Sequence, residues 1–318
     1  MILQTTIPLK KQQFHKVDYN SKLLLIGSCF SENIGKKLAY YKFQSTTNPF
    51  GILFHPKAIE TLIKMAINEK KHTTKDVIFN NEQWHSFNAH SNLSSSDKNE
   101  LIHNLNTANT LTLQQLKNAT HIIITLGTSW VYRFIETDTI VANCHKIPQK
   151  KFLKEILTVD EITESIDAIT KLITSINKNV TITFTVSPVR HLKDGFIENQ
   201  RSKSHLLAAI HQLLDSVQSD KINYFPSYEI MMDELRDYRF YTEDMIHPSK
   251  IAVDYIWERF TDVWFSEQTK ETMNKVETVQ KGITHRSFNP TSEAHLKFLN
   301  NLQQKKETLI KAFPFMKF

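Results

Sequence analysis

The sequence predicts an α/β protein of three layers, with a central, mostly parallel five-stranded sheet between helices. Short apolar runs alternate along the chain with segments whose apolar residues recur at helical spacing, and this alternation is typical of parallel sheets. Three of only six glycines, Gly27, Gly51 and Gly127, fall at or near the ends of strand-like runs. Ligands of α/β proteins bind at the carboxyl ends of the strands, so we expect a site at that edge.

Five short runs are the predicted strands of this sheet. In chain order they are residues 22–26, 42–46, 121–126, 180–186 and 222–225. The first run, KLLLI, is apolar apart from its first residue, as expected of a central strand that is buried on both faces. Two antiparallel hairpins are predicted outside the sheet, one over residues 76–87 and the other within residues 131–147.

Six segments with helical spacing of their apolar residues are predicted to connect or follow the strands. They lie near residues 31–41, 55–66, 100–116, 159–176, 202–217 and 249–265. The remaining tail is charged and helical in pattern. We therefore predict a main domain over residues 1–267 and a C-terminal helical extension, residues 268–318, packed on it.

Composition narrows the class of protein. The chain has 318 residues and a formal net charge of +6, but its lysines are scattered in pairs beside acidic residues. Without a continuous basic stripe, we predict no nucleic-acid partner. No apolar run approaches the ~20 residues of a membrane span, and the N-terminus lacks the pattern of a secretion signal. Two cysteines, Cys29 and Cys144, are too few for a disulfide scaffold, which predicts a cytoplasmic location with reduced thiols. The oligomeric state stays open.

A candidate nucleophile follows the first strand. Cys29 lies two residues after Gly27 and directly before a predicted helix. The positive end of a helix dipole favours a thiolate, although a small buried cysteine packed under a turn fits the same position. Far along the chain, Asp244 precedes His247 by three residues, near the start of another predicted helix. A carboxylate so placed can fix the tautomer of the imidazole and leave its other nitrogen to act as a base.

Further polar residues are predicted to surround this centre. The backbone N–H of Gly51 and the side chain of Asn48 are candidate donors to an oxyanion. Candidate substrate ligands lie on segments that should reach the same edge: Trp84, His85, His90, His145 and Arg190. The histidine spacings match no established zinc pattern, so no metal and no other cofactor is predicted.

Several strings, in this order, resemble the GSCFA domain family, which is grouped with the SGNH (GDSL-like) hydrolases. They are GSCFS at 27–31, NPFG at 48–51, WHSF at 84–87, SPVRHLKDG at 187–195 and DMIHPS at 244–249. The resemblance covers roughly residues 20–265 and implies an SGNH-like fold. It also implies a nucleophile at Cys29, or at Ser28 if the register moves by one residue. Ser129 occupies the place where SGNH hydrolases have an asparagine that donates to the oxyanion.

These features predict an acyl hydrolase or acyltransferase acting on an ester or thioester of a small molecule or carbohydrate. Cys29 or Ser28 would carry the acyl group, with His247 as base and Asp244 as the residue that orients it. Two alternatives stay open at this point. One is a non-catalytic protein that binds a glycan or another ligand on the same scaffold, and the other is a redox-sensing thiol at Cys29.

Overall fold

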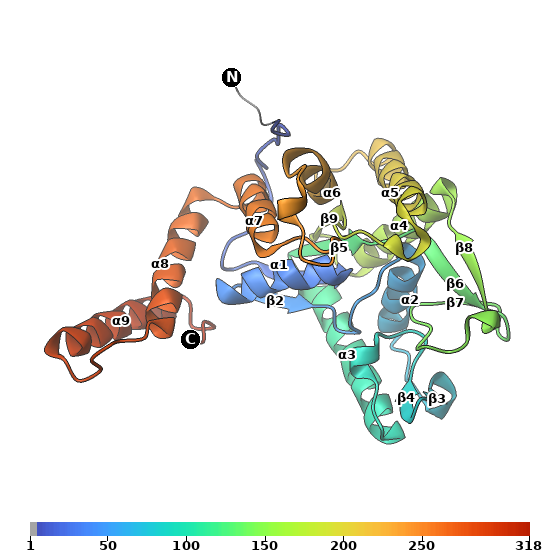
Figure 1. The fold of residues 1–318 in the computed structure, drawn as a ribbon, viewed down its shortest axis with the longest axis horizontal. Coiled ribbons are helices and arrows are strands. Elements are labelled where there is room, and N and C mark those ends of the chain that lie inside the picture. The colour runs from blue at the N-terminus through green and yellow to red at the C-terminus, as the bar shows by residue number, and fades with distance from the viewer. Residues whose placement is uncertain (1–4) are drawn as a thin grey trace.

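The computed structural model describes residues 5–318, and a five-stranded parallel sheet forms its centre (Figure 1). Its strands are β1 (Lys22–Gly27), β2 (Gln44–Thr47), β5 (His121–Leu126), β9 (Thr181–Val186) and β10 (Ile222–Tyr224). They are ordered β10-β9-β5-β1-β2, and every neighbouring pair is parallel. The predicted fold class is confirmed, and the predicted strands differ from the observed ones by no more than two residues at either end.

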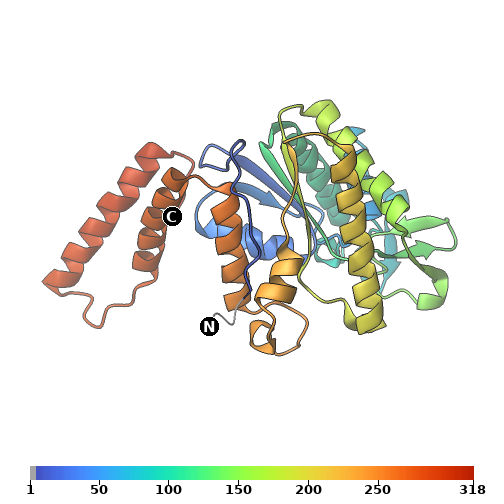
Figure 2. The same ribbon diagram turned by 90° about the horizontal axis from the view of Figure 1, so that it is seen from above.

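The alternation of side chains along β1 divides the core into two parts. Leu24 and Ile26 pack on one face of the sheet, and Leu23 and Leu25 on the other. The first face is covered by α2 (Pro56–Ile67), α3 (Lys98–Asn118), α4 (Val159–Ile176) and α5 (Phe196–Ser216). The second is covered chiefly by α1 (Cys29–Tyr40) and α7 (Lys250–Trp264), which gives the three layers visible in Figure 2.

The strand order reverses direction between β1 and β5. From β1 the chain crosses to β2 on one side, whereas β5, β9 and β10 are added in turn on the other. Such a reversal opens a crevice between the loops that follow the two strands, because those loops leave toward opposite faces of the sheet. Cys29 follows β1 and Gly127 follows β5, so the topology places the predicted nucleophile at this point.

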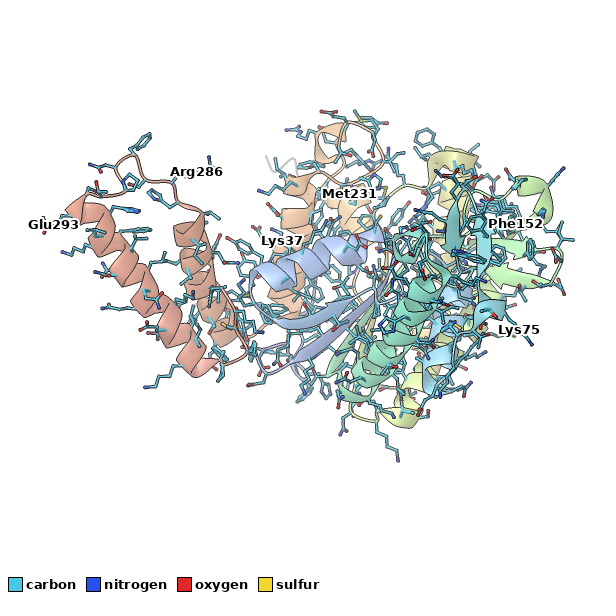
Figure 3. The ribbon with its side chains drawn as sticks, turned by 90° about the horizontal axis from the view of Figure 1, so that it is seen from below. Lys37, Lys75, Phe152, Met231, Arg286 and Glu293 are labelled. Carbon is cyan, nitrogen blue, oxygen red and sulfur yellow. The ribbon has the colours of Figure 1, made fainter. Side chains whose placement is uncertain are left out.

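Both predicted hairpins are present outside the central sheet. The first joins β3 (Ile78–Asn80) to β4 (Gln83–His85), and the second joins β6 (Trp130–Phe134) to β7 (Thr139–Val141). A further strand, β8 (Phe152–Ile156), pairs with β6 and was not predicted from the sequence. Phe152, labelled in Figure 3, joins Phe134 and Val141 in a small separate core beneath this sheet.

Two helical segments differ from their predicted form. Helix α5 begins at Phe196, six residues before its predicted start, and the side chains of Phe196 and Ile197 are exposed. Because this first turn buries no apolar stripe, hydrophobic periodicity could not reveal it. Residues 227–234 form a short helix, α6 (Ser227–Glu229), that continues into a π-helical turn at Ile230–Glu234. A helix this short has too few turns for a periodic pattern.

The C-terminal helices α8 (Glu267–Thr284) and α9 (Glu293–Ala312) form an antiparallel hairpin that projects from the body (Figures 1 and 2). Met273, Val276 and Val279 of α8 join the second part of the core. The far end of the hairpin, marked by Arg286 and Glu293 in Figure 3, lies away from the sheet. The predicted division into two domains at residue 267 stays a prediction.

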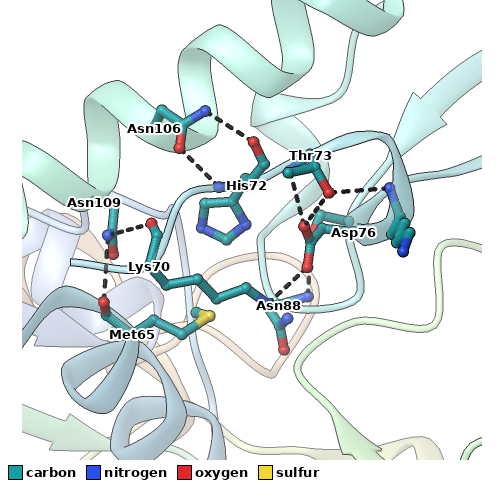
Figure 4. A network of polar contacts seen from close by, with 10 residues as sticks. Met65, Lys70, His72, Thr73, Asp76, Asn88, Asn106 and Asn109 are labelled. Atoms are coloured by element: carbon teal, nitrogen blue, oxygen red, sulfur yellow. Dashed lines mark hydrogen bonds and ion pairs between the residues drawn. The ribbon is translucent and has the colours of Figure 1, made fainter. Parts of the chain in front are cut away.

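Polar side chains of α3 fix the segment that follows α2 (Figure 4). The side chain of Asn109 donates to the carbonyl of Lys70 at 2.9 Å, and Asn106 exchanges hydrogen bonds with the backbone N–H and carbonyl of His72 at 2.8 and 3.1 Å. Lys70 also pairs with Asp76 at 2.6 Å. The ring of His72 is buried in this network, and in the part of the chain that the structure describes neither of its nitrogens has a hydrogen-bond partner.

Candidate active site

The turn after β1 presents Cys29 and buries its neighbour. Gly27 has a φ of +139°, a conformation that other residues rarely adopt, and the N–H of Ser28 donates to the carbonyl of Thr125 at 3.0 Å. Ser28 caps α1, its hydroxyl accepting from the N–H of Phe30 at 3.3 Å, and is fully buried. Cys29 begins the helix and is partly exposed. Of the two candidate nucleophilic residues, only Cys29 is therefore partly accessible in this conformation.

The Asp244 carboxylate holds the imidazole of His247. Its Oδ2 lies 2.6 Å from His247 Nδ1, and its Oδ1 accepts from the backbone N–H groups of His247 and Ile246 and from the hydroxyl of Thr242. These hydrogen bonds, chiefly that from the His247 N–H, hold the pKa of Asp244 well below its usual range. Within residues 5–318, His247 Nε2 accepts or donates no hydrogen bond, so it is available to a reacting group.

The loop that carries His247 is joined to the loop after β9. The N–H of Arg190 donates to the carbonyl of Ile246 at 3.2 Å, and its guanidinium reaches the carbonyl of Met245 at 3.5 Å. The same guanidinium lies over the ring of Tyr241, 4.1 Å from its centroid. Arg190 therefore holds the Asp244–His247 loop against the carboxyl end of the sheet.

A buried lysine joins two strand ends at this edge. Lys203 of α5 is fully buried, and its Nζ donates to the carbonyl of Gly127, after β5, at 2.7 Å and to that of Ser187, after β9, at 2.8 Å. Burial lowers the pKa of Lys203 to about 7, and the only charge that opposes this effect is that of Cys29. Sequence reasoning missed Lys203. The available signal was a charged residue at helical spacing from the buried Leu206 and Ile210.

His191 completes the cluster. A Cβ on Gly127 would lie 3.2 Å from His191 Nε2, and the imidazole stands edge-on to the ring of Phe54 at 5.3 Å. Burial, and then the charges of Lys203 and His247, lower the pKa of His191 to about 3, so its ring is neutral near pH 7. His191 Nε2 is buried and has no hydrogen-bond partner among residues 5–318.

The electrostatics of Cys29 follow from these neighbours. Burial raises the pKa of its thiol, and the largest opposing influence is the charge of Lys203, followed by the N–H groups of Cys29 and Phe30 at the helix start. In the described part of the chain, the thiol makes no hydrogen bond to His247. Catalytic hydrogen bonds are often long in a protein without its substrate, so this geometry leaves the pair as candidates.

The three predicted oxyanion donors differ in availability. Asn48 accepts the N–H of Gly27 through Oδ1 at 2.9 Å, while its Nδ2 is buried without a partner. The N–H of Gly51 is bonded to the carbonyl of Asn48 at 2.7 Å. The hydroxyl of Ser129 is fully buried and donates to the carbonyl of Ser202 at 3.2 Å. Of these three donors, only that of Asn48 is left without a partner in the described residues 5–318, and the oxyanion roles of all three stay predictions.

Comparison with known proteins identifies the family to which this chain belongs. Residues 22–260 match the sequence model of the GSCFA family. The chain belongs to the GSCFA family. Residues 276–318 match the C-terminal domain of GSCFA domain proteins. The family resemblance predicted from the motifs is confirmed. No curated protein matches the sequence significantly.

Two solved structures resemble this GSCFA chain at low similarity. One is a carbohydrate esterase family 3 protein from Talaromyces cellulolyticus, with 7% identity and a TM-score of 0.36, covering 81% of this chain and 99% of that one. The other is the acetyl xylan esterase Est2A from the rumen bacterium Butyrivibrio proteoclasticus, with 11% identity and a TM-score of 0.38. The match covers 77% of the GSCFA chain and 63% of Est2A. Both TM-scores fall below 0.5, so these likenesses assign no function.

Most of the predicted substrate ligands lie together in the region of the first hairpin. The rings of His85 and His145 stack at 4.5 Å, and all four of their nitrogens contact oxygen atoms of the protein. His90 caps a turn by accepting from the N–H of Asn92, and the ring of Trp84 lies under Lys98 Nζ at 4.4 Å. Arg190 alone lies against the His247 loop. The role of these five residues in binding stays a prediction.

A groove of about 520 Å³ lies beside the cluster in the GSCFA chain. It runs between the carboxyl edge of the central sheet, represented by Phe54, Thr128 and His191, and the added sheet, represented by Trp130 and Tyr132. Its size is in the range of small-molecule sites. Among residues 5–318, no group of three or more His, Cys, Asp or Glu side chains is arranged to hold a metal ion. No helix in this part of the chain has the length and apolar character that crossing a membrane requires.

Proposed function

We propose that this GSCFA protein is an acyl hydrolase or acyltransferase that carries its acyl group on Cys29. The observation that supports this most strongly is the Asp244–His247 pair, with 2.6 Å between Oδ2 and Nδ1 and with Nε2 left free. The pair is held at the carboxyl end of the sheet through Arg190, the same edge at which α1 presents the thiol. A thiol, a base and a residue that orients the base are the parts of a covalent acyl-transfer site.

In the proposed reaction, Cys29 Sγ attacks the carbonyl carbon of an ester or thioester while its proton moves to His247 Nε2. The carbonyl oxygen takes up the negative charge and receives a hydrogen bond from Asn48 Nδ2, which has no partner in the free protein. When the intermediate collapses, the alcohol or thiol leaves with the proton from His247. Water or an acceptor hydroxyl, deprotonated by His247, then attacks the thioester and restores the thiol.

Cys29 is preferred to Ser28 on burial and hydrogen bonding. The Ser28 hydroxyl has no exposed surface and is engaged as the cap of α1, and its use as a nucleophile would uncap the helix. Cys29 is partly exposed at the first position of the same helix. A thiol is also the stronger nucleophile once it is ionised.

The proposed substrate is an acylated small molecule or carbohydrate bound in the groove beside His191. The aromatic rings of Phe54, Trp130 and Tyr132 provide apolar surface, and Thr128 and the lysines of the groove provide polar contacts. Pockets that are largely apolar with a few polar groups are typical of small-molecule sites.

A second candidate function is ligand binding without catalysis. Two of the three predicted oxyanion donors, the N–H of Gly51 and the hydroxyl of Ser129, are bonded inside the protein. A site that lacks these donors can still bind an acylated ligand but stabilises a tetrahedral intermediate less.

Hydrolysis of p-nitrophenyl acetate, together with intact-mass analysis of the acylated protein, separates these functions. We expect Cys29→Ala and His247→Ala to abolish turnover, whereas the matched controls Cys144→Ser and His103→Ala keep it. The acetyl group should be trapped on Cys29 in wild type. If Cys29→Ala and His247→Ala hydrolyse the ester at the wild-type rate, the mechanism is wrong. Ligand binding with neither turnover nor acylation would establish the second function instead.

A further inference from the structure

Lys203 is a buried charge that the proposed acyl-transfer steps do not use. It projects from α5 into the carboxyl end of the sheet, and its side chain has no exposed surface. Within residues 5–318 it forms no ion pair, and its two acceptors are the backbone carbonyls of Gly127 and Ser187. A buried ammonium without a carboxylate is unfavourable, because carbonyl dipoles replace only part of the hydration that it loses. Such a group is a candidate for a role in the site.

The two acceptors of Lys203 follow neighbouring strands of the sheet. Gly127 follows β5, the strand beside β1, and Ser187 follows β9, the next strand in the sheet. The loop after β9 continues to Arg190, which holds the Asp244–His247 loop, and to His191. One side chain therefore fixes the strand ends from which the base is positioned. The end of β5 also contacts the turn that carries Cys29, because the N–H of Ser28 donates to the carbonyl of Thr125, two residues before Gly127, at 3.0 Å.

The groups that face Lys203 come from three elements. They are Cys29 at the start of α1, His191 in the loop after β9 and Tyr228 of α6, whose ring centroid lies 5.6 Å from Nζ. His191 is neutral near pH 7, and burial raises the pKa of Tyr228, so neither supplies a negative charge. Glu32 is the other charged group that acts on Cys29, and it disfavours the thiolate. Cys29 is thus the one group of this set that can become an anion next to Lys203.

We propose that Lys203 is a positioning residue of the Cys29 site, whose ammonium fixes the ends of β5 and β9 and stabilises the Cys29 thiolate as it forms. The proposal rests on Cys29 being the nucleophile of the proposed function. Its geometric support is the pair of hydrogen bonds from Lys203 Nζ to the carbonyls of Gly127 and Ser187, at 2.7 and 2.8 Å, at the strand ends beside the turn of Cys29. Burial favours the neutral form of both groups, but the charge of each lowers this effect on the other: Lys203 lowers the pKa of Cys29, and Cys29 raises that of Lys203.

The pH dependence of alkylation tests the proposal without any substrate. In a Cys144→Ser background Cys29 is the only thiol. Its reaction with iodoacetamide can be followed by mass between pH 7 and 11, a range chosen because burial raises the pKa of Cys29. Lys203→Met removes the charge and keeps the length of the side chain. We expect alkylation at pH 7 to slow roughly tenfold, with the midpoint of the profile raised by about one unit. Lys203→Arg should restore part of the rate, and Lys171→Met, an exposed control on α4, should leave the profile unchanged. A folded Lys203→Met variant with the wild-type profile overturns the proposal.

A second measurement covers the case in which Lys203→Met does not fold. The Nζ resonance of Lys203 in ¹⁵N-lysine-labelled protein can be titrated in wild type and in Cys29→Ala. We expect the titration to move to lower pH in Cys29→Ala, because the thiolate that favours the charged amine is gone. An unchanged titration overturns the proposal. If alkylation depends on Lys203 but no ester is hydrolysed, the proposed function fails while this inference stands. If turnover needs Cys29 but the alkylation profile is the same with and without the Lys203 charge, this inference fails while the proposed function stands.

Discussion

Gly27 lies so close to Thr125 that a Cβ added to Gly27 would stand 2.1 Å from the Thr125 carbonyl oxygen. The contact joins β1 to β5 at the point where the strand order reverses, one residue before the helix cap. It brings the turn that carries Cys29 against the strand next to it, and only a residue without a side chain allows this approach.

Gly27→Ala is therefore expected to destabilise the protein by at least about 2 kcal/mol, from strain at a φ of +139° together with the clash. Urea denaturation measures the change. Gly195→Ala is the matched control, because Gly195 also has a positive φ, +95°, but no atom lies within 4 Å of its Cβ position. Gly195→Ala introduces the backbone strain without the clash, so it should lower the free energy of unfolding by less than Gly27→Ala does. Equal losses in the two variants would show that the contact with Thr125 contributes nothing.

Asp244→Asn should lower kcat about 100-fold or more while stability changes little, because the amide cannot stabilise the imidazolium of His247 as the carboxylate does. The side chains of both residues are nearly half exposed, so the loss of the pair does not disturb the core. Steady-state kinetics and a thermal melt measure the two effects. Asp237→Asn, on an exposed turn nearby, is the control. An unchanged kcat in Asp244→Asn would exclude the carboxylate from the reaction.

Asn48→Asp should reduce kcat about 100-fold with a smaller change in KM, because it removes the free N–H proposed for the oxyanion. An aspartate keeps the acceptor for the Gly27 N–H and tolerates the positive φ of this position, +45°. Asn81→Asp is the control, since Asn81 has a φ of +46° and lies in the first hairpin. If kcat is retained in Asn48→Asp, the oxyanion is stabilised by other donors.

Stability is expected to fall as the pH drops from 7 toward 4, because several histidines are buried in the neutral form. Burial lowers the pKa of His55 and of His145 to about 4, and it also lowers the pKa of His72, whose ring has no hydrogen-bond partner in the network of Figure 4. The unfolded chain takes up the protons of His55 and His145 near pH 6.5 and the folded chain only near pH 4, and His72 shifts in the same direction. This contribution to stability is therefore complete above pH 6.5 and is lost as the pH falls below it.

Urea midpoints measured between pH 5 and 7, where few carboxylates titrate, should therefore rise with pH. His72→Leu should flatten part of the slope, whereas the exposed control His103→Leu should not. A midpoint that is constant over this range would mean that the buried rings are charged in the folded protein.

The central sheet and the Asp244–His247 pair were predictable because their signals are local. Apolar runs that end in glycine or proline mark β1, β5 and β9, and a carboxylate three residues before a histidine can contact it within one turn of chain. The environment of Cys29 was not predictable in the same way. Lys203 reaches the site through acceptors 76 and 16 residues away, and nothing in its neighbouring sequence shows where α5 packs.

The hydrogen bonds of the predicted site residues could not be predicted from the sequence either. His85 and His145 were predicted to face a ligand, but their ring nitrogens contact Asn80, Ser94, Ser86 and Ser91 in the folded chain. Polar residues on a loop give the same sequence pattern whether their side chains bind a substrate or form hydrogen bonds that fix the conformation of the loop. The difference is settled by tertiary contacts, which a single sequence does not contain.

The parallel order of the central sheet also bears on how the chain folds. No two neighbouring strands of this sheet are joined by a short turn, and β1 meets β5 across a separation of about 98 residues. Such a topology has a high contact order, which slows folding because long loops must close before the strands gain their contacts. The turn that carries Cys29 is synthesised early but acquires its neighbours from β5, α5 and the His247 loop late. A nascent chain therefore exposes an ordinary thiol at Cys29, and a thiol with these neighbours exists only once nearly the whole domain has folded.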